Sequence, residues 1–361
     1  GGSDRLVRSG RQGPVPGRPV SGVHWPLAEK VARRMAGSYP LEGTYHDALL
    51  ARRSPGLVER AAGLVAAETG LAWSGIPSVE VVTRAEWAAA NLGAFEKMLA
   101  PAEERLAAGR RGLGASLAAR LMGAEVGALV GALSRKVLGQ YELVLPADDG
   151  SGDTILFVGG NILAMERLYE FRPEEFRFWV ALHECTHRLQ FVGVPWMKGY
   201  FLDLVRELID ASLPEEGSPG RLSELREAAR EGRPLMVESG LLGMLATPAQ
   251  RQSIDRMQAL MSLLEGHGHV VMDRIGAREL VTQGRMSQVL KSRRQDPRTK
   301  AFLRFTGLEM KMKQYELGER FIEGVERHAG FSALDRVWEG PEHLPTLDEI
   351  TAPHRWLERV A

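Results

Sequence analysis

The sequence is poor in cysteine and has no excess charge of either sign. One thiol, Cys185, among 361 residues cannot form an internal disulfide, which excludes a small secreted scaffold held together by disulfides. The 46 Lys and Arg residues balance 46 Asp and Glu residues, so the chain lacks the basic field of nucleic-acid and anionic-membrane binders. We therefore expect a cytoplasmic protein with no nucleic-acid partner.

Long apolar segments are also scarce, and residues 112–133 are the one stretch that raises the question of a membrane span. Glycines recur there every four residues from Gly123 to Gly131, as in closely packed membrane helices. Arg120 and Glu125 lie inside the segment, however, and a charge in the middle of a bilayer is costly. We expect a buried helix of a soluble core, with no membrane partner, whose glycines let another helix approach.

Composition divides the chain into three parts. Residues 1–22 are rich in Gly, Pro and Arg and are typical of a flexible lead-in. Residues 23–150 predict an N-terminal helical part whose strands contribute to a sheet, and residues 151–361 predict the core that carries the motif described below. Within this core we expect a helical insertion over about residues 196–256, followed by C-terminal helices.

Three short segments have the composition of strands, namely residues 79–82, 141–145 and 154–158. A turn-rich stretch between the last two predicts a hairpin. We therefore expect an α+β fold that is mostly helical, with a small antiparallel sheet. The strand at residues 154–158 is expected at the sheet edge, where an extended peptide could add as a further strand.

The strongest chemical signal is the pentapeptide His183-Glu184-Cys185-Thr186-His187 within a predicted helix. Residues four apart share a helix face, so His183 and His187 can offer imidazole nitrogens to one ion. Glu184 points beside that ion, where it can take a proton from a metal-bound water. Cys185 lies on another face and is expected to be packed rather than reactive. The alternative is two packed histidines without a metal, which an apolar helix rarely tolerates beside a carboxylate.

A catalytic zinc ion needs a third protein ligand and one position open to water. An extended form of this motif has a third histidine six residues after the second, with a glycine between them. It is absent here, because Gly193 occupies the histidine position and Gln190 occupies the glycine position. Glu207, Glu265 and His269 remain as candidates. We favour Glu265, since its apolar helix contains two glycines that each cost roughly 1 kcal/mol and would let the histidine helix lie close. Glu207 lies in an ordinary amphipathic segment, where a solvated carboxylate is expected.

Three residues near Glu265 are candidates for supporting roles. His269 shares a helix face with Glu265 and could be a ligand, a group supporting a ligand or a donor to the transition state. His267 projects from the opposite face and is expected to be structural. Asp273, two turns after Glu265, could orient a ligand histidine through its other ring nitrogen, or be a solvated helix carboxylate.

The frames around these residues resemble those of a known family. WVALHECTHRLQFVGVPW, LLEGHGHVVMD and GLEMKMKQYELGERF are similar to segments of an uncharacterised zincin-like family of hydrolases, described as zinc-dependent metalloproteases or as associated with deazaflavin cofactor biosynthesis. The resemblance covers residues 25–361 and implies a zincin-like fold with helical additions and one zinc ion per chain. It implies His183 and His187 as ligands with Glu265 as the third, in a gluzincin pattern, and Glu184 as the base. The interval from His187 to Glu265 is far longer than in simpler gluzincins. A helical insertion must therefore extend from the core after His187, and the chain must come back to the core at Glu265.

Gluzincins commonly place a Tyr or His donor where it steadies the oxyanion. Tyr315, which shares a predicted helix face with Lys311, and His269 are the candidates here. The simpler interpretation of Lys311 and Tyr315 is a surface lysine and an interfacial tyrosine. Residues 285–300 are basic but have no interleaved aromatic residues, so we expect a solvated face there.

The sequence therefore predicts a zinc-dependent hydrolase, and first among these a metallopeptidase. A zinc-bound water activated by Glu184 would attack the amide carbonyl of a peptide or amide substrate. Two alternatives stay open: a zinc-holding binding or scaffold protein without general proteolytic activity, and a metal-dependent hydrolase of a non-peptide amide. No particular oligomeric state is predicted.

Overall fold

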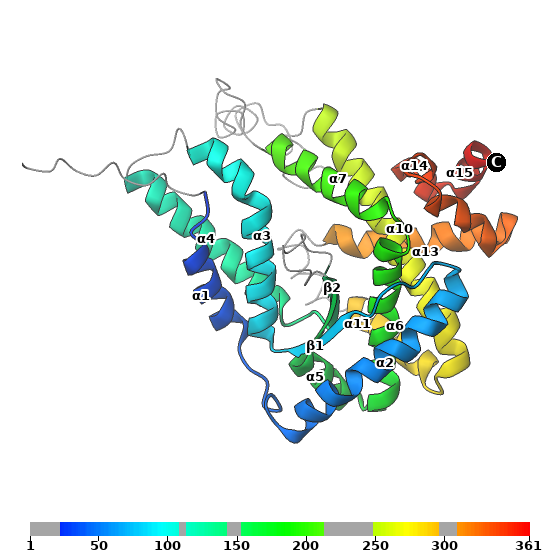
Figure 1. Ribbon diagram of the computed structural model, residues 1–361, viewed down its shortest axis with the longest axis horizontal. Coiled ribbons are helices and arrows are strands. Elements are labelled where there is room, and N and C mark those ends of the chain that lie inside the picture. The colour runs from blue at the N-terminus through cyan, green and yellow to red at the C-terminus, as the bar shows by residue number, and fades with distance from the viewer. Residues whose placement is uncertain (1–21, 108–112, 143–152, 213–247, 296–308) are drawn as a thin grey trace, which may run out of the picture.

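The computed structural model describes residues 22–107, 113–142, 153–212, 248–295 and 309–361. Helices dominate these residues, and three short strands form one sheet between two groups of helices (Figure 1). An α+β, mostly helical fold is therefore confirmed. Most of the expected lead-in (residues 1–21) and the middle of the expected insertion (residues 213–247) lie outside the described residues.

Helices begin where local chemistry favours them. The Thr83 hydroxyl accepts a hydrogen bond from the Glu86 N–H before α3, and the Glu86 carboxylate accepts one from the Thr83 N–H, a capping box. Pro173 opens α6, with Glu174 and Glu175 in its first turn, where acidic side chains oppose the helix dipole. The helices are α1 (Trp25–Ala36), α2 (Tyr45–Thr69), α3 (Arg84–Ala107), α4 (Leu113–Leu133), α5 (Gly159–Tyr169), α6 (Pro173–Val192), α7 (Met197–Ser212), α10 (Pro248–Glu279), α11 (Gln283–Gln295), α13 (Glu309–Ala329), α14 (Leu347–Thr351) and α15 (Pro353–Val360), with 3-10 helices η1 (Phe331–Trp338) and η2 (Pro341–His343).

The sheet is mixed, and its central strand is β3 (Thr154–Val158). β1 (Ser78–Val82) runs parallel to β3, and β2 (Gly139–Glu142) runs antiparallel to it. The expectations of an antiparallel sheet and of a peptide-binding edge at residues 154–158 are therefore wrong, because β3 has a neighbour on each side. All five residues of β3 are buried, and its four consecutive apolar residues from Ile155 to Val158 are typical of a strand covered on both faces.

β2 forms the outer edge of the sheet on the side of α6. The Val158 N–H donates to the Leu138 carbonyl, and Gln140 lies opposite Leu156. Because successive residues of an antiparallel strand alternate between bonding the partner and facing away, the N–H and C=O groups of Gly139 and Tyr141 point outward. This outer edge of β2 lies beside the helix that carries the histidine motif.

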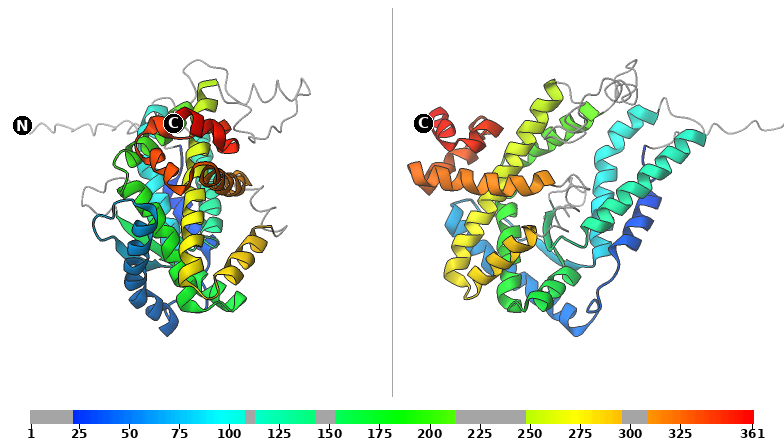
Figure 2. Two further views of the ribbon diagram at one scale, coloured as in Figure 1. Left: turned by 90° about the vertical axis from the view of Figure 1, so that its right-hand side faces the viewer. Right: turned by 180° about the vertical axis from the view of Figure 1, so that it is seen from behind.

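Among the described residues, three apolar clusters hold the helices to the sheet and to one another. Ile155 and Phe157 pack with α2 and α6 on one face of β3, while Leu156 and Val158 pack with α1, α3 and α4 on the other. A further cluster joins α7, α10, α13 and the C-terminal helices. Figure 2 shows the α1–α3–α4 group on one side of the sheet and α10, α13 and the C-terminal helices on the other.

α4 packs on α1 through its glycine stripe. A Cβ on Gly127 would overlap the carbonyl oxygen of Ala28, so the two backbones touch. The opposite side of α4 is exposed, as at Leu117 and Leu121, which corrects the expectation of a buried helix. By length and composition Gly114–Leu133 could cross a membrane, and 28% of its apolar 18-residue stretch is buried.

Replacing Gly127 by Ala should destabilise the protein by about 1–3 kcal/mol, because an added methyl group would force α1 and α4 apart. Gly63→Ala in α2 is the matched control. No atom lies within 4 Å of its added Cβ, so helix propensity should make this variant more stable by up to roughly 1 kcal/mol. Urea unfolding of both variants measures the difference, and a Gly127→Ala midpoint equal to the wild-type midpoint would contradict the contact.

Candidate metal centre

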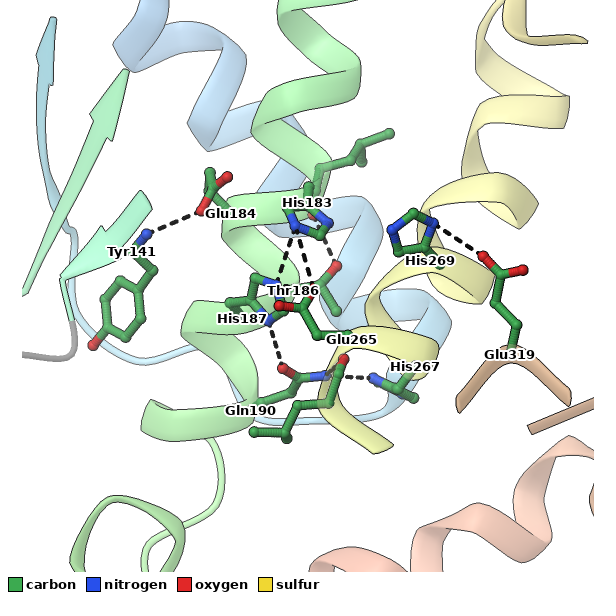
Figure 3. Close-up of polar contacts among 12 residues, drawn as sticks. Tyr141, His183, Glu184, Thr186, His187, Gln190, Glu265, His267, His269 and Glu319 are labelled. Carbon is green, nitrogen blue, oxygen red and sulfur yellow. Dashed lines mark hydrogen bonds and ion pairs between the residues drawn. The ribbon is translucent and has the colours of Figure 1, made fainter. Parts of the chain in front are cut away.

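α6 and α10 bring His183, His187 and Glu265 together (Figure 3). The Nε2 atoms of the two histidines lie 3.2 Å apart, and Oε2 of Glu265 lies 3.9 Å from that of His183 and 3.5 Å from that of His187. In the part of the chain that the structure describes, they form the one group of three possible ligands whose donor atoms all lie within 4.8 Å of one another. Two helices thus unite the predicted histidines with the favoured third residue.

The three donor atoms fit a zinc ion. A circle through three points at these separations has a radius of about 2.1 Å, which matches Zn–N and Zn–O bond lengths. Lone pairs of two imidazoles and a carboxylate oxygen repel one another at such distances unless a proton or a cation lies among them. The side chains of His183 and His187 are 21% and 16% exposed, so one side of the group is accessible to solvent.

The electrostatics of the group favour a positive charge at this point. Burial alone would lower the pKa of His187, but the negative charge of Glu265 and a hydrogen bond with it outweigh burial. Glu184 and Gln190 act in the same direction, and the pKa of His187 rises to about 9. A carboxylate that attracts a proton so strongly will also attract a divalent cation in its place.

Gln190 orients His187 and ties α6 to α10. Nδ1 of His187 donates to Oε1 of Gln190 at 2.9 Å, and Nε2 of Gln190 donates to the Leu264 carbonyl at 2.9 Å and to Nδ1 of His267 at 3.0 Å. Burial and then the neighbouring His187 lower the pKa of His267 to about 3, so its neutral ring accepts this bond. When a cation takes the place of the proton on Nε2, the hydrogen on Nδ1 leaves the Nε2 lone pair to face that cation.

Glu184 lies beside the three-residue group. Its side chain is buried, and its Oε2 accepts a hydrogen bond of 2.9 Å from the backbone N–H of Tyr141 in β2 (Figure 3). The carboxylate therefore stands between α6 and the outer edge of β2, on the side expected for the residue that follows the first histidine.

His269 approaches the group from α10. Its ring centroid lies 5.7 Å from that of His183, and its Nδ1 lies 3.2 Å from Oε1 of Glu319 on α13. Figure 3 shows the second ring nitrogen of His269 on the side of His183. His267 packs against Phe331 and Trp338 instead, which agrees with a structural role.

The two glycines next to Glu265 serve different neighbours, which corrects the expectation that both admit α6. A Cβ on Gly266 would overlap the backbone of Gly318, so this glycine admits α13. A Cβ on Gly268 would lie 3.6 Å from Cε1 of His187, so only this glycine faces the histidine rings. Because Glu319 follows Gly318 in sequence, the close crossing of α10 and α13 also brings Glu319 to His269.

Two of the other predicted residues lie away from the group. Glu207 accepts a hydrogen bond of 2.8 Å from Ser253 and pairs with Arg256 between α7 and α10. Asp273 accepts a hydrogen bond of 3.0 Å from Gln283. The second ring nitrogen of His187 therefore bonds Gln190, while Asp273 bonds Gln283.

The remaining predicted residues do not add to the group. Tyr315 lies on α13, but its side chain and that of Lys311 lie outside the described part of the chain, as do residues 296–300. In the described part of the basic segment, Arg285 is exposed and donates to backbone carbonyls of α5 and the residue after it. Cys185 is fully buried, and burial raises the pKa of its thiol far above the ordinary value, so it is packed.

Comparisons with known proteins agree with this geometry. The family model of zincin-like metallopeptidases matches residues 23–357. A crystal structure from Chloroflexus aurantiacus, described as that of a candidate hydrolase with a novel fold, is 30% identical and superposes with a TM-score of 0.69. The match covers 93% of this chain and 98% of that chain. The comparison with curated proteins finds no match.

Replacing Gln190 by Ala should weaken zinc binding about 10–100-fold, because His187 would lose the partner that fixes its ring and tautomer. Gln283→Ala is the control, since Gln283 bonds Asp273 outside the group and its loss should leave zinc affinity unchanged. Competition with a chromophoric chelator measures both affinities. Equal zinc affinity in wild type and Gln190→Ala would show that Gln190 does not orient the ligand.

Proposed function

The chain belongs to the zincin-like metallopeptidase family, and on this premise we propose that it is a zinc-dependent hydrolase of peptide bonds. The observation that carries the proposal is the convergence of His183, His187 and Glu265, with Glu184 held beside them. Two histidines and one glutamate are among the ligand sets of catalytic zinc, which keep one position open to water.

Each residue of the site has a proposed role. His183, His187 and Glu265 hold one zinc ion per chain, which, when bound, acts as a Lewis acid toward a carbonyl and makes water more acidic. Glu184 takes a proton from the attacking water and delivers it to the leaving amine. His269, held by Glu319, stabilises the negative charge on the carbonyl oxygen when both its ring nitrogens carry hydrogen.

The outer edge of β2 supports a peptide as the substrate. Gly139 and Tyr141 direct backbone groups away from β3. The Tyr141 N–H among them is bonded to Glu184, which leaves the Tyr141 carbonyl and the backbone of Gly139 to meet a peptide. An extended peptide that added along this edge would bring its own backbone beside the proton-transferring carboxylate. The candidate strand for peptide addition is therefore the edge strand β2 and not the central strand β3.

Glu265→Ala should reduce the zinc content from about one ion per chain to nearly none, because two histidines alone do not hold a catalytic zinc ion. Glu207→Ala is the control, since this carboxylate bonds Ser253 and Arg256 instead, and it should keep its zinc. Mass spectrometry measures the zinc content per chain of both variants and of the wild type. Zinc retained in Glu265→Ala would remove Glu265 from the ligand set.

Glu184→Gln should keep its zinc and lose turnover by about 10²–10⁴-fold, because the amide cannot accept the proton of the attacking water. The assay uses casein, small aminoacyl reporters and N-acyl amides, each with and without a chelator. Hydrolysis of N-acyl amides alone would make the protein a non-peptide amidase. A zinc-loaded wild type that cleaves none of these substrates would favour a zinc-holding binding protein, and full activity in Glu184→Gln would refute the mechanism.

A further inference from the structure

Arg188, whose side chain is buried, forms an ion pair with the half-buried Asp153 one helical turn from Glu184. We propose that this pair is a positioning device, which fixes β2 against α6 so that the backbone of β2 holds the Glu184 carboxylate in place. The effect on turnover rests on the proposed function, whereas the effect on the position of β2 does not.

The environment of Arg188 is that of a structural clamp. Its side chain is fully buried, its Nε lies 2.7 Å from Oδ1 of Asp153, and its Nη2 lies 2.5 Å from Oδ2. Nη2 also donates to the Ser74 carbonyl at 2.6 Å, and the guanidinium lies 4.2 Å from the centroid of the Trp73 ring. A two-bond pair of this kind is directional, and removal of one buried partner is costly.

The backbone connects this clamp to Glu184. Asp153 directly precedes β3, in which Thr154 pairs with Glu142 and Ile155 pairs with Tyr141 of β2. The ion pair therefore anchors the beginning of β3, and with it β2, to the helix that carries Glu184. The anchored strand β2 is also the strand whose Tyr141 donates its N–H to Glu184.

The side chain of Tyr141 adds a second connection. Burial, the negative charge of Asp153 and a hydrogen bond with it raise the pKa of Tyr141 to about 12, although Arg188 acts in the opposite direction. The phenol therefore stays protonated beside the Asp153 carboxylate. The side chain of Tyr141 thus senses the ion pair, while its backbone N–H holds Glu184.

The contact between β2 and Glu184 leaves little freedom. A Cβ on Gly139 would lie 2.7 Å from Oε1 and 2.8 Å from Cγ of Glu184, so the backbone of β2 packs directly on the carboxylate. Glu184 is therefore confined by Gly139 on one oxygen and bonded by Tyr141 on the other. A displacement of β2 would displace the carboxylate as well.

α6 itself supplies a matched control. Arg177, whose side chain is also buried, pairs with the buried Glu166, with Nε to Oε1 at 2.6 Å and Nη2 to Oε2 at 2.8 Å. This pair joins α6 to α5 and does not touch β2. Arg177→Lys should thus cost a similar amount of stability without moving Glu184.

The test is hydrogen–deuterium exchange of the full-length protein, read on the peptide that contains Gly139–Glu142. Arg188→Lys should raise amide exchange in this peptide about tenfold or more, because the local opening free energy falls. Arg177→Lys should leave it at the wild-type rate. Unchanged exchange in Arg188→Lys, or an equal rise in Arg177→Lys, would overturn the proposal.

Gly139→Ala tests the same contact if Arg188→Lys does not fold, because it leaves the ion pair intact. It should also raise exchange in the β2 peptide, while Gly199→Ala, whose added Cβ has no atom within 4 Å, should not. Unchanged exchange in Gly139→Ala would overturn the role of β2.

With an active wild type, Arg188→Lys should lower kcat about tenfold or more at unchanged zinc content and nearly unchanged KM, because a misplaced catalytic group slows the chemical step. A kcat equal to that of Arg177→Lys would reduce the pair to a stabilising contact. An inactive wild type would count against the proposed function alone. Amide exchange in the β2 peptide would still show whether the ion pair fixes β2 against α6.

Discussion

The packing of α10 against α6 is the constraint on which the rest of the site depends. α6 offers two histidines on one face, but they can share an ion only if a third ligand comes from another element. α10 brings Glu265 to within 3.5 Å of His187, and the same crossing brings Leu264 and His267 to the amide of Gln190. A shift of α10 by one residue along its axis would break these contacts together, so the site and the helix crossing are one unit.

α10 can hold this register because it belongs to two apolar clusters at once. Val271 and Met272 pack with α6, α2 and the sheet, whereas Leu260 and Leu263 pack with α13 and the C-terminal helices. The contact between Gly266 and Gly318 removes any space between α10 and α13. The C-terminal helices thus contribute to the centre by fixing the helix that carries Glu265.

Features of the site that depend on local sequence could be predicted, and those that depend on distant partners could not. His183 and His187 share a face because of helix geometry alone. The glycines near Glu265 indicate that another helix lies close, although only Gly268 faces the histidine rings. Glu319 carries no local signal, since its role depends on His269 on another helix. Gln190 lies one turn after His187 on the same helix, but its bonds to Leu264 and His267 depend on α10. Arg188 likewise acquires its role only through Asp153, which adjoins another strand.

The errors in the fold have the same origin. Whether two strands run parallel depends on the path of the chain between them, which the composition of β1 and β3 does not contain. The buried run at residues 154–158 did carry a signal for a central strand, because both of its faces need apolar cover. α4 shows the reverse case, in which small residues meet a single neighbour and leave the other side exposed.

Because the crossing of α6 and α10 fixes the centre, flexible chain can be added between the two helices, outside the packed helix α7, at little cost in free energy. Closing a connection twice as long costs only about 0.6 kcal/mol, which is small beside the packing of two helices. Evolution can therefore lengthen or shorten this connection without disturbing the ligands. Proteins with the same centre need not share the interval from His187 to Glu265, and a search for a fixed spacing would overlook them.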